Sequence, residues 1–170
     1  MKLTNAIKSA MPVAVLGFLA LGLTSTPAFA TTQTTTFAVT ATVQGTCTIS
    51  ATALSFGAYT GALVNMANTI TVNCTGGTTY NVGLGVGGST GATVTTRKMT
   101  GQYHPTGTLA YSLYQDSGHS VNWGQTVGTD TEASAGTGLP QSLTVYGQIP
   151  AGTAPAADAY SDSITATITY

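Results

Sequence analysis

The feature that most constrains this chain is the alternation of apolar and polar side chains in short runs. Apolar residues recur at every second position in these runs, and clusters of Gly, Asn and Thr separate one run from the next. No segment after residue 30 has the 3.6-residue period of an amphipathic helix. The sequence therefore predicts an all-β fold, and strands at this spacing favour a β-sandwich. The predicted strands of the domain are residues 46–50, 53–59, 68–74, 79–88, 92–101, 107–116, 142–150 and 160–170.

The first 30 residues have the composition of an export signal. Lys2 and Lys8 give a positive start, residues 12–23 are an apolar run, and residues 28–30 (AFA) are a small-x-small cleavage site. The apolar run is too short for a membrane span, which needs about 20 apolar residues. An uncleaved membrane anchor is the alternative. We expect residues 1–30 to be a cleaved signal peptide, so that the product is exported.

The chain after the predicted signal peptide has few charged residues. Without Lys2 and Lys8 the chain keeps two cations, Arg97 and Lys98, against five acids, so its formal net charge is two minus five, or −3. Such a chain has no basic patch for a phosphate backbone, which argues against nucleic acid as a partner. We expect the two cations in a solvated loop or edge. Only 5% of the residues are charged, against about 25% in ordinary soluble domains, which suits a surface covered by copies of itself.

Cys47 and Cys74 are the two cysteines of the chain. In an exported protein an even count of cysteines favours disulfides, and two cysteines allow one intramolecular pairing. The alternative is a metal or redox pair, but there is no CxxC motif and no histidine near either residue. We predict a Cys47–Cys74 disulfide, which the chain-entropy estimate values at roughly 3 to 4 kcal/mol.

No cofactor is predicted. Gly83, Gly85 and Gly88 spell GxGxxG, but the dinucleotide-binding version of this motif needs a helix after it and an acid about 20 residues on. Neither is present in the sequence. The simpler interpretation is a strand whose glycines let another backbone pack closely.

No catalytic or metal site is predicted either. Asp116 and His119 lie three residues apart, yet no GxSxG nucleophile elbow accompanies them. His104 and His119 both lie in polar, Gly-rich stretches, which favours surface histidines, and no ligand spacing typical of a metal centre is present. The chain is not predicted to be an enzyme.

An aromatic residue offers one candidate for surface binding. Trp123, between Asn122 and Gly124, could stack on a sugar or contact another surface. The alternative is a core position, and the sequence favours the core.

The segment before the domain has a strand pattern of its own. Residues 31–45 carry Phe37, Val39, Ala41 and Val43 at alternate positions, so these four side chains face one side of an extended chain. A strand is unexpected at the start of a secreted domain, where most chains are ragged. With Cys47 marking the start of the domain proper, we assign residues 31–45 to a separate segment and residues 46–170 to the β-sandwich domain.

Several short motifs together resemble one known family. The chain is similar to the spore coat protein U family, which includes the subunits of archaic chaperone–usher pili such as the Csu-type pilins. The resemblance covers nearly all of the chain after the signal, in order, and is carried by Cys47, LSFGxY at 54–59, Cys74, YxVxL at 80–84, LxYxLYxD at 109–116, WG at 123–124, VxGxIPAG at 145–152 and YSDSITxTITY at 160–170.

This resemblance implies a fold and a mode of assembly. It implies an incomplete immunoglobulin-like β-sandwich that lacks its final strand. In that family a periplasmic chaperone lends the missing strand, and the N-terminal extension of the next subunit replaces it at an outer-membrane usher. The expected partners are therefore copies of the chain in a head-to-tail polymer, a periplasmic chaperone, an outer-membrane usher and other pilus subunits. Phe37, Val39, Ala41 and Val43 would be the donor-strand contacts, with a one-residue slip in register as the open alternative.

The leading interpretation is a structural pilus subunit at the cell surface, active in attachment and biofilm formation. The alternatives are a tip adhesin that binds through Trp123 or loop aromatics, and a self-contained secreted or coat protein of the same fold. In the last case the 31–45 strand would fold back on its own domain.

Overall fold

The structure is a computed structural model that describes residues 27–170. The chain divides into two compact units, Met1–Thr40 and Ala41–Tyr170. Described residues of the first unit, 27–40, are exposed and form neither helix nor strand. Most of the predicted signal peptide lies outside the described residues. From residue 27 onward, no helix has the length and apolar character needed to cross a membrane.

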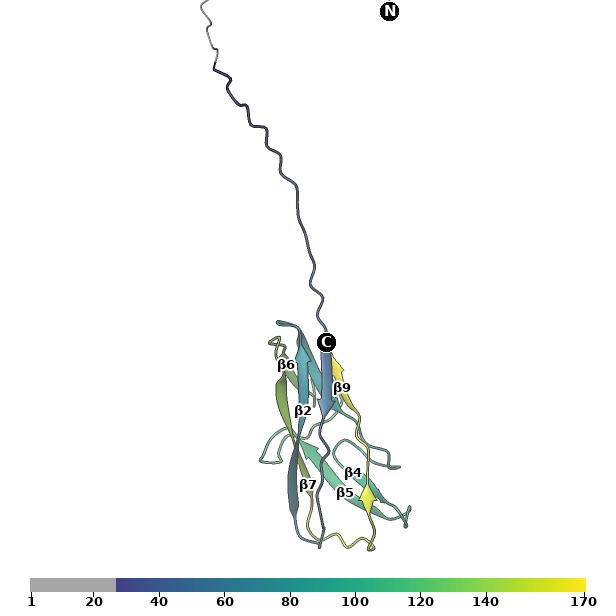
Figure 1. Ribbon diagram of the computed structural model, residues 1–170. Coiled ribbons are helices and arrows are strands. Elements are labelled where there is room, and N and C mark those ends of the chain that lie inside the picture. The colour runs from purple at the N-terminus through teal and green to yellow at the C-terminus, as the bar shows by residue number, and fades with distance from the viewer. Residues whose placement is uncertain (1–26) are drawn as a thin grey trace, which may run out of the picture. The chain divides into compact units, whose positions relative to one another are not determined.

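The second unit is built from antiparallel strands in two sheets (Figure 1). One sheet has six strands in the order β1-β2-β7-β5-β4-β8, and the other has three in the order β6-β3-β9. Within residues 27–170 there is no helix, so the predicted all-β sandwich is confirmed. The strands are β1 (Cys47–Ala51), β2 (Val64–Cys74), β3 (Thr79–Leu84), β4 (Arg97–Gly101), β5 (Thr108–Tyr114), β6 (Glu132–Ala135), β7 (Gln141–Ile149), β8 (Tyr160–Ser161) and β9 (Ala166–Thr169).

The alternating side chains of these strands make the core. In β2, Ile70 and Val72 are 1% and 0% exposed, whereas the residue between them, Thr71, faces outward and is half-buried. This pattern continues into β3 and β5, as predicted from the alternation. The buried apolar residues are Ile70, Val72, Cys74, Tyr80, Val82, Leu84, Leu109, Tyr111, Leu113, Trp123, Val145 and Ile149.

The predicted disulfide is confirmed. Cys47 and Cys74 are paired residues in the register of β1 and β2, and a disulfide bond joins them. The bond closes a 27-residue separation, so it ties the first strand of the domain to the long β2 strand. By the chain-entropy estimate a loop of this length contributes roughly 3 to 4 kcal/mol.

Two predicted strands differ from the structure in the same way. Residues 53–59 form no strand, and the predicted strand 160–170 is broken into β8 and β9, with residues 162–165 in neither. In Figure 1 this last part of the chain, in yellow, runs from the short β8 to β9 along one edge of the domain. In both segments apolar residues still alternate inward. Alternation reports which side chains face the core, and it does not report whether the backbone has a partner.

Gly83, the first glycine of the GxGxxG stretch, follows the simpler interpretation, whereas Gly85 and Gly88 lie beyond the end of β3. A Cβ atom on Gly83 would lie 3.0 Å from the Gln125 Cα atom and 3.4 Å from the Gly124 carbonyl oxygen. Strand β3 ends at Leu84 with no helix after it. Gly83 is therefore the place where a loop backbone packs closely against the strand.

Gly147 has a different packing role in β7. A Cβ atom there would lie 2.5 Å from Leu54 Cδ2 and 2.9 Å from Phe56 Cζ. Because Gly147 has no side chain, the Leu54 and Phe56 side chains of residues 53–59 can pack directly against the sheet.

We therefore predict that Gly147→Ala lowers the free energy of unfolding by about 1–3 kcal/mol, the usual range for overpacking a filled core. Gly76→Ala is the matched control, because the nearest atoms to its Cβ would be 3.8 Å away. Urea unfolding of both variants measures the difference. Equal losses in the two variants would contradict this packing account.

Candidate functional site

An open groove of about 1130 Å³ runs along the domain between two chain segments. We call residues 52–60 the first wall and residues 153–166 the second wall. Between the walls the groove reaches the apolar core itself. Its floor is formed by Ile70 from β2, Leu84 from β3, Met99 from β4, Leu109, Tyr111 and Leu113 from β5, and Val145 and Ile149 from β7.

The first wall is held by hydrogen bonds at its two ends, and the backbone between them is unpaired. At one end the Thr52 N–H donates to the Thr69 carbonyl at 3.0 Å. At the other end the Tyr59 hydroxyl donates to the Pro150 carbonyl at 2.7 Å. Within the described chain, no backbone N–H or C=O of residues 53–59 has a hydrogen-bond partner. Such a segment offers the donors and acceptors that an added strand would use.

Side chains hold the middle of the first wall against the core. Leu54 and Phe56 are half-buried and pack on the core cluster. The Phe56 ring meets Tyr111 edge-on, with ring centroids 5.9 Å apart. These contacts act through alternate side chains only. They hold the segment in place, and its backbone N–H and C=O groups remain without hydrogen-bond partners among residues 27–170.

Carboxylates hold the second wall, beginning with Asp162. Its Oδ2 accepts a hydrogen bond from the Tyr111 hydroxyl at 2.7 Å, and its Oδ1 accepts one from the Gly88 N–H at 2.8 Å. Burial, together with the hydrogen bond to Asp162, raises the pKa of Tyr111 far above its usual range. Tyr111 therefore stays a neutral donor, and the contact fixes the wall to β5.

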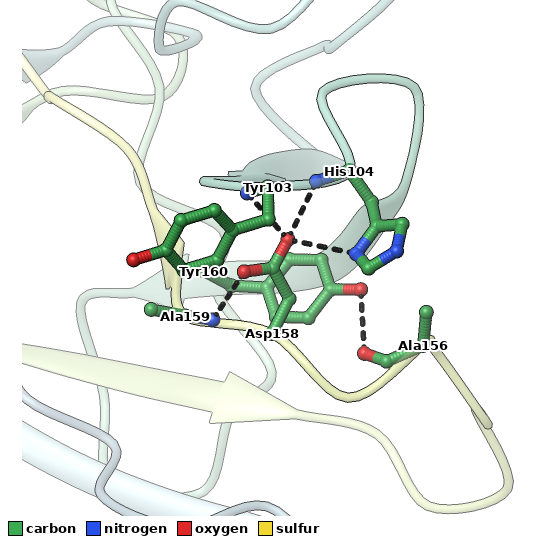
Figure 2. A network of polar contacts seen from close by, with 6 residues as sticks. All are labelled: Tyr103, His104, Ala156, Asp158, Ala159 and Tyr160. Carbon is green, nitrogen blue, oxygen red and sulfur yellow. Dashed lines mark hydrogen bonds and ion pairs between the residues drawn. The ribbon is translucent and has the colours of Figure 1, made fainter.

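Asp158 holds the same wall against the turn between β4 and β5 (Figure 2). Its Oδ2 accepts hydrogen bonds from the backbone N–H groups of Tyr103 at 2.9 Å and His104 at 2.8 Å, and lies 3.3 Å from His104 Nδ1. Its Oδ1 accepts one from the Ala159 N–H at 2.8 Å. Burial of this carboxyl would raise its pKa, but the amide hydrogen bonds outweigh burial and lower the pKa of Asp158 below its ordinary value.

Arg97 lies behind the groove and links the two sheets. Its guanidinium donates to the carbonyls of Leu84 (2.9 Å), Gly85 (2.8 Å), Val94 (2.6 Å) and Trp123 (2.7 Å). The side chain is fully buried, so the expectation of a solvated cation is wrong for Arg97. Burial lowers its pKa, and nearby phenol and carboxylate groups offset part of that effect. The carbonyl cage lets a charge lie inside the sandwich, since a buried charge needs partners.

Trp123 does not present its ring to the surface. The side chain is 1% exposed, and its indole N–H donates to the Val82 carbonyl at 2.8 Å. The favoured core position is confirmed, and the surface-binding alternative is wrong for this side chain.

Within residues 27–170, the two histidines lie in separate surroundings. The His104 side chain is 57% exposed beside Asp158, and His119 packs edge-on against Tyr114 and Tyr146. Across residues 27–170 no group of three or more His, Cys, Asp or Glu could hold a metal ion. The chemistry that the groove offers is apolar burial plus unpaired backbone, which is the chemistry of strand addition.

The four side chains predicted as donor-strand contacts are all exposed. Phe37, Val39 and Val43 are 84%, 83% and 82% exposed, and Ala41 is also exposed. Among the described residues, the segment 31–45 pairs with no strand. The sequence patterns did not identify either wall of the groove as a segment without a strand partner. The Ser-Asp-Ser break at residues 161–163 was the available signal, because two polar residues there flank an inward-facing acid.

A family model and a curated relative agree on what this chain is similar to. The family model described as Spore Coat Protein U domain matches residues 33–167. The chain belongs to this family. It is also 37% identical over 183 aligned residues to Protein U of Myxococcus xanthus, an alignment that covers 98% of this chain and 99% of that protein.

A solved structure supports the fold. The domain resembles a chain in the crystal structure of the CsuC–CsuE chaperone–tip adhesion subunit pre-assembly complex from the archaic chaperone–usher Csu pili of Acinetobacter baumannii, with a TM-score of 0.59 and 21% identity. The match covers 76% of this chain and 41% of that one, so this chain spans about two-fifths of its length. At this identity the likeness shows a shared fold.

We predict that Arg97→Lys destabilises the domain, because one ammonium replaces a fork that serves four carbonyls, two of them in buried hydrogen bonds and two in partly buried ones. The expected loss in free energy of unfolding is about 1–3 kcal/mol for each carbonyl left without a donor. Lys98→Arg, at the adjacent half-buried position, is the matched control and should change it by less than about 0.5 kcal/mol. Denaturant unfolding of the disulfide-bonded protein tests this, and a neutral Arg97→Lys would contradict the cage.

Proposed function

We propose that this chain is a structural subunit of an extracellular pilus, assembled by the chaperone–usher pathway through donor-strand exchange. In this assembly, residues 31–45 of one subunit add a strand to the groove of the next. Membership in the Spore Coat Protein U family and the fold shared with a chaperone–usher pilus protein support this assignment.

The observation that carries the proposal is the unpaired backbone on both sides of the groove. The first wall has free N–H and C=O groups along residues 53–59, and residues 162–164 of the second wall pair with no strand. Between them lies exposed core surface. An inserted strand would gain backbone hydrogen bonds from its edges and bury alternate side chains at the floor.

The segment 31–45 has the properties of such a strand. Phe37 to Val43 spans seven residues, or about 23 Å when extended, and the free stretch of the first wall, residues 53–59, is also seven residues long. Its apolar residues alternate and are exposed in a single chain. Together these features favour burial of Phe37, Val39, Ala41 and Val43 against the groove floor.

Exchange between subunits makes a fibre rather than a closed ring. The segment and the groove are different surfaces, so their contact is heterologous and can repeat without closing. Each insertion also covers a sheet edge and an apolar groove that would otherwise promote aggregation.

The remaining partners follow from this mode of assembly. A periplasmic chaperone would cover the groove before assembly, an outer-membrane usher would catalyse exchange, and other pilus subunits would join the same fibre. The chain would be exported through the periplasm to the cell surface, where the fibre supports attachment and biofilm formation.

A self-contained coat protein is the second candidate. The family name refers to spore coat, and the 37% identical relative is Protein U of Myxococcus xanthus. In that case the 31–45 segment would fill the groove of its own chain, and the protein would remain monomeric.

We predict that Val39→Asp prevents polymer formation, because it would place a charge at the apolar floor and lose several kcal/mol of contact free energy. Thr40→Asp is the matched control: the neighbouring side chain faces the other side of an extended strand, so its polymer should form normally. Electron microscopy and gel analysis of undenatured polymer provide the measurement. The opposite ranking of the two variants would indicate a register shifted by one residue.

Deletion of residues 31–43 behind the intact export signal tests the donor segment as a whole. We expect a disulfide-bonded, secreted monomer that forms no fibres. Fibres built from the truncated subunit would refute the donor-strand assignment. A full-length chain that stays monomeric at all concentrations would favour the self-contained coat protein instead.

A further inference from the structure

Asp158 occupies a position that strand addition alone does not explain. Its carboxylate side chain is 0% exposed, although it belongs to an irregular segment at the rim of the groove. Three backbone N–H groups donate to it, two from the β4–β5 turn and one from Ala159. The carboxylate itself is buried, and amide donors on both of its oxygens take the place of the water that an ionised group needs.

The contacts of Asp158 connect two segments that have little other pairing. Strand β8 pairs with β4 over only two residues, Thr100↔Ser161 and Gly101↔Tyr160. One further backbone bond, from the Gln102 N–H to the Ala159 carbonyl at 2.9 Å, extends this pairing. The part of the second wall before β8 is therefore held to the turn mainly through the Asp158 carboxylate.

The turn itself is shaped to receive this carboxylate. A Cβ atom on Gly101 would lie 2.6 Å from Asp158 Oδ2 and 2.8 Å from the His104 carbonyl oxygen. The Tyr160 hydroxyl donates to the Ala156 carbonyl at 2.9 Å, which closes the segment on itself (Figure 2). Glycine at position 101 leaves the space in which wall and turn meet.

We propose that Asp158 is a positioning residue for strand capture, whose carboxylate holds the second wall against the β4–β5 turn and keeps the groove in its receptive shape. This inference rests on the proposed function. It adds that the groove wall is held by an ionised side chain and is therefore released by acid. The disulfide and the core strands do not depend on this carboxylate, so release of the wall precedes loss of the fold.

The direction of the pH effect follows from the lowered pKa of Asp158. A carboxyl with a depressed folded-state pKa contributes stability that is complete above its unfolded value, about 3.9, and is lost as the pH falls through the folded value. The titratable residues beside the carboxylate are Tyr103 and His104 from the turn and Tyr160 from its own segment. Within residues 27–170, no lysine or arginine pairs with it.

The test measures capture of a labelled peptide, residues 31–45, by the full chain at neutral pH and at about pH 3. The variant is Asp158→Asn, which has one acceptor oxygen where the carboxylate uses two. Its control is Asp116→Asn, which alters another amide-capping carboxylate, bonded to the Ser120 and Val121 N–H groups, that does not line the groove.

We expect the wild type to capture the peptide roughly ten-fold more slowly in acid. Asp158→Asn should be slow at both pH values, and Asp116→Asn should follow the wild type. A wild-type pH profile in Asp158→Asn would overturn the inference while leaving the proposed function intact. No capture by the wild type at neutral pH, with a Val39→Asp peptide behaving identically, would overturn the proposed function and this inference with it.

A second measurement needs no variant. Hydrogen exchange of the Tyr103, His104 and Ala159 amides in the full chain reports the state of the carboxylate contacts. These amides should lose protection in the same pH range in which capture slows, while amides of β2 and β7 stay protected. Loss of protection without any change in capture would overturn the positioning role.

Discussion

The structure depends on one missing neighbour strand. Residues 53–59 and residues 162–164 lie on either side of the groove, and neither segment pairs with a strand of the described chain. A β-sandwich is stable when each strand has a neighbour for its N–H and C=O groups, and here two facing segments lack one. The core side chains between these segments are packed together, and their open side forms the floor of the groove. The other unusual features of the domain lie around this deficit and compensate for it with side-chain contacts.

Three of the few charged residues make contacts around the groove. Arg97 bonds four carbonyls between the sheets, while Asp158 and Asp162 tether the second wall. Asp116 and Asp130 each accept backbone N–H groups within their own loops. The low charge content thus has a structural meaning: ionised groups are placed where the backbone lacks a partner, and the outer faces of the sheets carry Thr, Ser, Asn and Gln instead. A neutral outer surface of this kind suits a subunit that packs among copies of itself.

Sequence reasoning reached the parts of the fold that depend on side-chain direction. Alternation in residues 68–74 and 107–116 correctly located the core faces of β2 and β5. The same alternation misled at residues 53–59 and at residues 162–164 within the predicted strand 160–170, because side chains face the core there while the backbone pairs with no strand. The burial of Arg97 was also unpredictable, since two of its carbonyl partners, Leu84 and Trp123, are distant in sequence and only the folded chain brings them together. The groove exists because no strand of the described chain lies between these two segments. Periodicity in a single sequence reports the direction of side chains, and it carries no signal for an absent neighbouring strand.

The arrangement explains why one chain would carry both an exposed apolar segment and an apolar groove. Each alone is an aggregation hazard, whereas the two together define a specific contact between copies. The electron cryo-microscopy structure of the assembled full-length polymer tests this claim most directly. The account predicts residues 37–43 of one subunit as a strand between residues 53–59 and 162–164 of the next, with Val39 directed at the core. An empty groove, or a groove filled by the segment of its own chain, would contradict it.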